Sequence, residues 1–187
     1  MNESFAYESA PIINFEKSIK TNRLVFKLTF GTIFDYFLSY FSSIFLIVLA
    51  GLFIPMMING LKNEFALTLA IICCVIVIVW MIANLILMNN LVVIDGSNLI
   101  SNKKRILKSL DALFDDIDSS KIDENVIRNI RLSTSIRWGR AITVLFNEEK
   151  IYLNILTLGR GDGPSPFHGL SNYIKCKRIA AIFNQMV

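Results

Sequence analysis

Two long apolar runs without a charged residue lie in the middle of this sequence and limit what it can fold into. They cover residues 36–58 and 65–88, which are 23 and 24 residues long. At a helical rise of about 1.5 Å per residue, each run spans roughly 34 to 36 Å, and a bilayer core needs about 20 apolar residues. A short polar turn, 59–64, separates them. The pattern predicts a transmembrane helical hairpin. The alternative is a pair of buried helices in a soluble protein, whose core helices are rarely so long and uncharged.

The hairpin divides the chain into three expected parts. These are an N-terminal segment at 1–35, the hairpin at 36–88 and a further domain at 89–187. The first apolar run begins 35 residues into the sequence and is too long for the apolar part of a signal peptide. We therefore expect the hairpin to be a permanent anchor.

Positive charge is concentrated on the two outer flanks of the hairpin. The turn carries only Lys62, whereas the flanks carry Lys17, Lys20, Arg23 and Lys27 on one side and Lys103, Lys104, Arg105 and Lys108 on the other. Lysine and arginine favour the cytoplasmic side. We expect a multi-pass protein of the cell inner (cytoplasmic) membrane with both termini in the cytoplasm. The net charge of +4 lies in 89–187, which favours contact with anionic headgroups or an anionic ligand.

The apolar runs contain no Asp, Glu, Lys, Arg or His. Such residues usually mark ion or proton pathways in membrane proteins, so the sequence argues against a transporter built from one chain. Two helices cannot enclose a pore, and a channel would need a homo-oligomer. Cys73, Cys74 and Cys176 lack metal-ligand spacing, and we expect them to be free thiols.

The domain at 89–187 shows mostly strand patterns. Residues 91–100 predict strand, turn and strand, because Asp95-Gly96 is a strong hairpin signal. Three runs rich in β-branched residues, 126–136, 140–146 and 151–158, predict an antiparallel meander, while 105–117 fits either a helix or a strand. The last segment, 172–186, has one apolar face and predicts an amphipathic helix capped by Ser171. The expected fold is a membrane α-helical hairpin plus a small antiparallel β-rich domain, PH-like or a minimal β-barrel, with a C-terminal amphipathic helix.

The segment just before the hairpin alternates between apolar and other residues from Leu24 to Phe30. This period of two is typical of a strand, which could join the sheet of the domain. An interfacial helix with Lys27 extended toward the headgroups is the competing interpretation.

The sequence offers no basis for an enzyme. His168 is the only histidine, and no zinc or triad spacing surrounds it. The acidic residues at 111–124 lack the spacing of a calcium loop. The glycine-rich loop at 159–166 lacks the Gly-Lys-Ser/Thr of a phosphate loop. We therefore expect no catalytic residue, no metal, no cofactor and no nucleic acid polymer as partner.

One basic group suggests a ligand site. Arg128, Trp138 and Arg140 lie close together in the sequence, and Arg128 shares a strand face with Ile130 and Leu132. An arginine directed toward an apolar face needs an anionic partner. A bound phosphate would supply it, and Trp138 could stack on a base. The alternatives are an exposed strand end or pairing with a nearby carboxylate.

The layout resembles two families by architecture. The run from Leu91 through the strands at 127–158 to the helix at 172–186 resembles the membrane-bound bacterial pleckstrin-homology-like domains. That resemblance implies a two-helix anchor followed by a seven-stranded sheet closed by a helix, whereas the residues predict five strands.

The order of two transmembrane helices and a compact β domain also resembles the membrane effectors of cyclic-oligonucleotide antiphage defence (CBASS-like). This resemblance implies a minimal β-barrel that binds a cyclic dinucleotide, and a protein that oligomerises and disrupts the membrane. It gives Arg128, Trp138 and Arg140 a role in ligand binding.

Three hypotheses follow. In the first, an anionic ligand such as a cyclic nucleotide binds the β domain and drives the hairpins to assemble and disrupt the bilayer. In the second, the chain is a pleckstrin-like membrane scaffold. In the third, it is an accessory subunit of a larger membrane complex.

Overall fold

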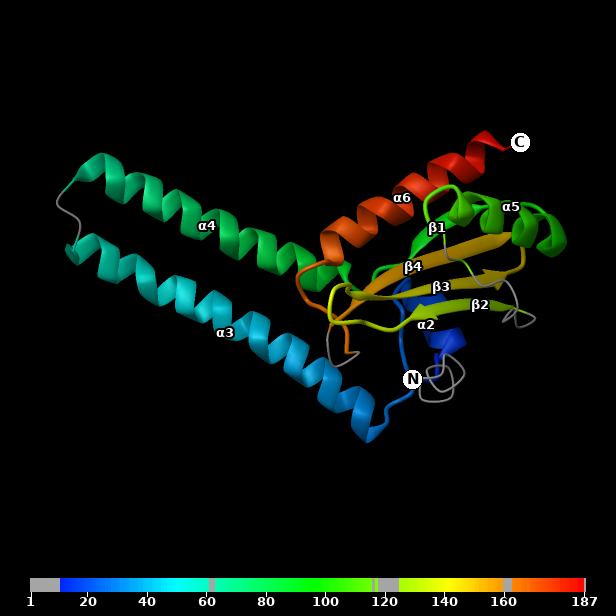
Figure 1. Ribbon diagram of the computed structural model, residues 1–187, viewed down its shortest axis with the longest axis horizontal. Helices are drawn as coiled ribbons and strands as arrows, with labels where there is room; N and C mark the ends of the chain where they lie inside the picture. Colours follow the sequence, from blue (N-terminus) through cyan, green and yellow to red (C-terminus); the bar gives the residue numbers. More distant parts are fainter. Residues whose placement is uncertain (1–10, 61–62, 116, 118–124, 160–162, 187) are drawn as a thin grey trace.

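The computed structural model describes residues 11–60, 63–115, 117, 125–159 and 163–186. Two long antiparallel helices, α3 (Phe30–Gly60) and α4 (Glu64–Leu87), extend away from a small domain that contains a sheet and, in the described part of the chain, three further helices (Figure 1). The predicted combination of a long helical hairpin, an antiparallel sheet and a C-terminal helix is confirmed at this level.

The hairpin helices are exposed rather than buried. Only 6% of the most apolar window of each helix is buried inside the protein, and both helices are long and apolar enough to cross a membrane. The alternative of buried core helices therefore does not fit the structure. Helix α3 begins at Phe30, six residues before the predicted start. Asn63 caps α4, because its side-chain oxygen accepts hydrogen bonds from the backbone N–H groups of Phe65 and Ala66.

The sheet has four antiparallel strands in the order β1-β4-β3-β2. Their bounds are β1 Val92–Asp95, β2 Val126–Arg131, β3 Gly139–Asn147 and β4 Lys150–Leu158. The meander predicted for the last three is confirmed, although β2 ends five residues early. In the part of the chain that the structure describes, β1 and β2 are open edges. Neither a closed barrel nor seven strands is present there.

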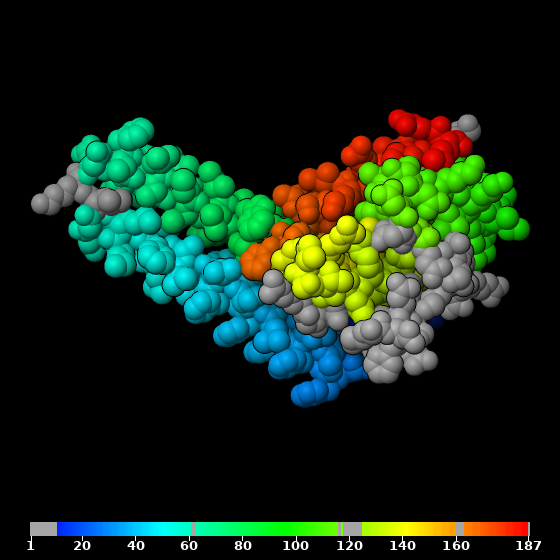
Figure 2. All heavy atoms as spheres, viewed as in Figure 1, coloured from blue at the N-terminus to red at the C-terminus, as the bar shows by residue number. Residues whose placement is uncertain are grey.

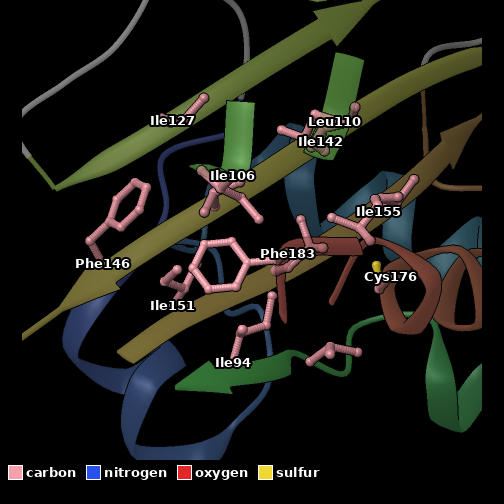
Figure 3. Packing of buried hydrophobic residues seen from close by; sticks show 14 residues of the cluster. Ile94, Ile106, Leu110, Ile127, Ile142, Phe146, Ile151, Ile155, Cys176 and Phe183 are labelled. Carbon is pink, nitrogen blue, oxygen red and sulfur yellow. The ribbon is translucent and has the colours of Figure 1, made fainter. Parts of the chain in front are cut away.

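One face of the sheet packs against two helices, α5 (Leu99–Asp111) and α6 (Gly169–Gln185). Alternate residues of the central strands, such as Ile142 and Ile155, point to this face. Figure 3 shows the ring of Phe183 from α6 packed among Ile94 and Ile151. This is the larger of the two cores.

The chain before the hairpin covers the other face. Helix α2 (Phe15–Thr21) leads into an extended stretch whose Leu24 and Phe26 pack in a second core with Tyr152 and Leu156. The Leu24 N–H donates to the carbonyl of Asn89 at 2.7 Å. Of the two interpretations of this stretch, the interfacial helix does not fit the structure, and the strand fits only in part, because the pairing consists of isolated bridges rather than a regular strand.

Two local predictions are wrong. The Asp95-Gly96 pair does not form a hairpin: it leads from β1 into α5, which Asn98 caps by accepting from the Ser101 N–H at 2.9 Å. The segment 105–117, whose pattern fitted either a helix or a strand, is helical up to Asp111, where the same helix ends. Ser171 is not a cap either, because α6 begins earlier, after His168.

Candidate functional site

The first turn of α6 docks directly on the last turns of α4. The side-chain oxygen of buried Asn84 accepts a hydrogen bond from the Leu170 N–H at 3.0 Å, and its amide donates to the Trp80 carbonyl at 2.8 Å. A side chain at Gly169 would place its Cβ 2.0 Å from the Asn84 carbonyl oxygen, so the close approach requires glycine. Phe167 stacks on Trp80 with ring centroids 6.5 Å apart.

Residues 163–168, here called the coupling segment, also contact α3. The hydroxyl of buried Ser39 donates to the carbonyl of Pro164. The Ser165 N–H donates to the Thr157 carbonyl at 2.8 Å, which fixes the same segment to β4. The coupling segment therefore joins the sheet to both hairpin helices.

A second set of hydrogen bonds lies where α4 runs into β1. The amide of buried Asn154, on β4, donates to the carbonyls of Met88 and Asn90 at 3.1 and 2.9 Å. The hydroxyl of Tyr36 donates to the Asn89 side chain at 3.1 Å. Directional bonds thus hold the base of both helices against the sheet.

The rings of Trp138 and His168 meet at the edge of the coupling segment. Their centroids lie 5.2 Å apart, and His168 Nδ1 shares a 2.8 Å hydrogen bond with the Ser165 hydroxyl. Partial burial, and then the positive charge of Lys175, lower the pKa of His168 below its usual 6.5. Both effects favour the neutral form of His168.

The structure places the predicted ligand residues apart. On one face, Arg128 donates from Nη1 to the Pro11 carbonyl at 2.6 Å, and its guanidinium lies 5.7 Å from the Phe26 ring. Arg140 is on the opposite face, with its guanidinium 3.9 Å from the Phe114 ring. Trp138 follows β2 in the turn before β3.

The strand register explains this separation. Arg128 lies opposite Thr143, and Arg131 opposite Arg140. Directly opposed residues share a face, so Arg128 shares its face with Thr143, whereas Arg140 points the other way. The structure does not bring Arg128, Trp138 and Arg140 into one pocket. Ligand binding by any of them stays a prediction.

The residues that do form the junction are polar groups in apolar surroundings. The sequence carries a signal for two of them, since Asn84 lies within the last part of an apolar run and Asn154 interrupts a strand of isoleucine and leucine. A buried amide requires partners. The pattern thus indicates that partners exist, but not that they are backbone groups of the hairpin and of α6.

The remaining groups of chemical interest are possible metal ligands and the cysteines. Among the described residues, no group of three or more His, Cys, Asp or Glu side chains could hold a metal ion. The three cysteines are free, as predicted. Burial raises the pKa of the Cys176 thiol to about 12, which leaves it protonated and unreactive. An apolar groove of 500 Å³ runs between α3 and α4, beside Cys73 and Met81.

Comparisons of this chain with family models, with curated proteins and with solved structures found no match.

Proposed function

We propose that this chain is an integral membrane protein whose hairpin holds the α/β domain in a fixed position at the cytoplasmic face, and that it acts as a non-catalytic scaffold. The observation that carries the proposal is the junction itself. Two exposed apolar helices require a non-aqueous environment, and both are bonded to the domain through Ser39, Asn84 and Asn154. A domain that is only tethered needs no such bonds.

The charge distribution supports the orientation. Exposed basic side chains of the domain, such as Lys104 and Lys108, and exposed Arg23 and Lys27 before α3 all lie on the same side of the hairpin. Lysine and arginine favour the cytoplasmic side. The domain then lies beside the anionic inner leaflet, whose lipids attract the positive surface of the domain.

Labelling of single cysteines tests this proposal. In a variant without the native cysteines, Asn63→Cys lies in the hairpin turn and Lys150→Cys in the domain. A membrane-impermeant maleimide should label Asn63→Cys in intact cells, and Lys150→Cys only after permeabilisation. The protein should also resist alkaline carbonate extraction. The reverse labelling pattern, or release by carbonate, would contradict the proposal.

A second candidate is ligand-driven assembly of the hairpins into a membrane-disrupting homo-oligomer, with an anionic ligand such as a cyclic nucleotide. The coupling segment favours it, because a shift at β4 would move α3 and α4 together. The separation of Arg128 from Arg140 weakens its original basis, since the two guanidinium groups lie on opposite faces of the sheet.

Toxicity on expression that depends on a nucleotide cyclase, with hairpin cross-linking that increases in parallel, would favour assembly over the scaffold. Equal toxicity and cross-linking with and without the cyclase would remove the support for this second candidate.

A further inference from the structure

The turn between β2 and β3, residues 132–138, presents apolar side chains to the outside. Ile136 is 91% exposed and Trp138 is 52% exposed, with exposed Arg137 between them. The turn is held closed, because the Thr134 N–H donates to the Arg137 carbonyl at 2.8 Å and the Arg137 N–H donates to the Thr134 hydroxyl at 3.1 Å. Ser135 and Ile136 therefore stand at a fixed tip.

This turn lies at the end of the sheet that faces the hairpin (Figure 1). Trp138 touches His168, and the neighbouring Phe167 stacks on Trp80 near the end of α4. In the space-filling view, the yellow surface of this region stands beside the hairpin (Figure 2). The exposed turn thus lies near the last turns of the apolar part of α4, around Trp80.

The chemistry of the turn matches one kind of surface. Tryptophan is enriched where a bilayer meets water, because its ring is apolar and its N–H is polar. Arginine extends its charged end toward phosphates while its stem stays in apolar surroundings. An isoleucine held at an exposed tip gains from burial in lipid and gains nothing in water. Ile136, Arg137 and Trp138 together supply all three properties.

We propose that the β2–β3 turn is a second membrane contact. Ile136 and the indole of Trp138 enter the boundary between headgroups and acyl chains of the leaflet that α4 leaves, and Arg137 binds lipid phosphates. This inference rests on the proposed function, because it requires the hairpin to be in the bilayer. It assigns Trp138 to lipid rather than to a nucleotide base. The contact restrains the domain against rocking on its hairpin.

The two tryptophans of the chain allow a direct test. Trp80→Phe leaves Trp138 as the reporter of the turn, and Trp138→Phe leaves Trp80 as the reporter of the hairpin. Each variant is placed in nanodiscs of phosphatidylcholine and phosphatidylglycerol, with and without bromine near the headgroup end of the acyl chains. We expect bromine to quench both tryptophans.

The reporters separate the two proposals. Quenching of Trp80 alone would overturn the membrane contact of the turn and leave the anchored hairpin intact. Quenching of neither would overturn both proposals. Disulfide cross-linking between copies through Ile136→Cys, without quenching of Trp138, would identify a second copy as the occupant and also overturn the lipid contact.

A charge at the tip provides the matched comparison. In the Trp80→Phe background, Ile136→Asp should lose quenching of Trp138 and shift its emission to longer wavelength. Ile100→Asp, at an 82% exposed isoleucine on α5 away from the hairpin, should change neither. Both sites are exposed, so folding is retained and circular dichroism verifies it. Unchanged quenching in Ile136→Asp would overturn the proposal.

Discussion

The two faces of the sheet are covered in different ways. On one face, α5 and α6 bury side chains such as Ile106, Ile179 and Phe183 completely, so that apolar contact dominates over the few hydrogen bonds there, such as that of the Asn172 amide to the Thr157 hydroxyl at 3.1 Å. On the other face, the chain that enters and leaves the hairpin is also held by directional bonds, from Arg128 to Pro11 and from Asn154 to Met88 and Asn90.

This difference separates the contacts that stabilise the domain from those that fix its position on the hairpin. Apolar burial is strong and non-directional, so the helix-covered face, which holds the larger core, should contribute more to the free energy of folding. A hydrogen bond contributes only about 0.5–1.5 kcal/mol net, but it fixes position. The face that meets the hairpin is therefore built to hold a geometry, and substitutions on the two faces should have different consequences.

The largest effect is expected for Phe183→Ala on the helix-covered face. Removing a fully buried ring leaves a cavity and should lower the free energy of unfolding by about 3–5 kcal/mol. Chemical denaturation in detergent, followed by circular dichroism, measures it. Ile174→Ala, at an exposed position on the same helix, is the control and should change little. Equal effects of the two would refute the assignment of this face as the main core.

A smaller loss is expected for Asn154→Leu on the other face. The carbonyls of Met88 and Asn90 lose their donor while they remain beside the sheet, at a cost of about 1–3 kcal/mol. The same denaturation experiment measures it, with exposed Asn184→Leu as the control. If Asn154→Leu is as stable as wild type, these bonds do not hold the hairpin base.

Asn84→Leu should loosen the junction without unfolding the domain. Loss of the bond to the Leu170 N–H should speed hydrogen exchange of that amide roughly two- to tenfold. Exchange at Ile179 and Phe183, farther along α6, should not change. Faster exchange along the whole of α6 would mean that Asn84 supports the fold rather than the coupling.

The smallest effect is a pH dependence from His168. Its pKa is lowered in the folded protein, so the unfolded chain binds a proton more readily. The stabilisation is present above the unfolded value of about 6.5 and is lost as the pH falls through 6.5 toward the folded pKa.

His168→Gln removes this titration, since the chain has one histidine. The wild type should lose more stability than His168→Gln between about pH 8 and about pH 5. Denaturation at both pH values measures the difference, and an equal loss in the two proteins would contradict the assignment.

Local sequence patterns predicted much of the fold. The apolar runs, the meander from β2 to β4 and the C-terminal helix follow from local periodicity, which depends on neighbouring residues only. The Asp95-Gly96 signal failed for a local reason as well. A Cβ at Gly96 would lie 2.3 Å from the Asn102 side chain, so the glycine serves close packing against α5 rather than a hairpin turn.

The ligand hypothesis depended on information that the sequence does not carry. The alternation of residues placed Arg128 on the more apolar face of its strand. Whether Arg140 shares that face depends on strand register, which the turn at 132–138 sets. A turn one residue longer or shorter would place the two arginines on the same face. The partner of Arg128, Pro11, lies over a hundred residues away in the chain, beyond any local pattern.

The coupling of domain to hairpin is the central claim, and an electron-spin distance measurement tests it most directly. In a variant without the native cysteines, spin labels at exposed Val79 on α4 and exposed Lys150 on β4 report the distance between the two parts in nanodiscs. The account predicts a single narrow distance distribution that broadens when Asn84 and Asn154 are both replaced by leucine. A broad distribution in the otherwise unsubstituted protein would show that the domain is only tethered, and would contradict the account.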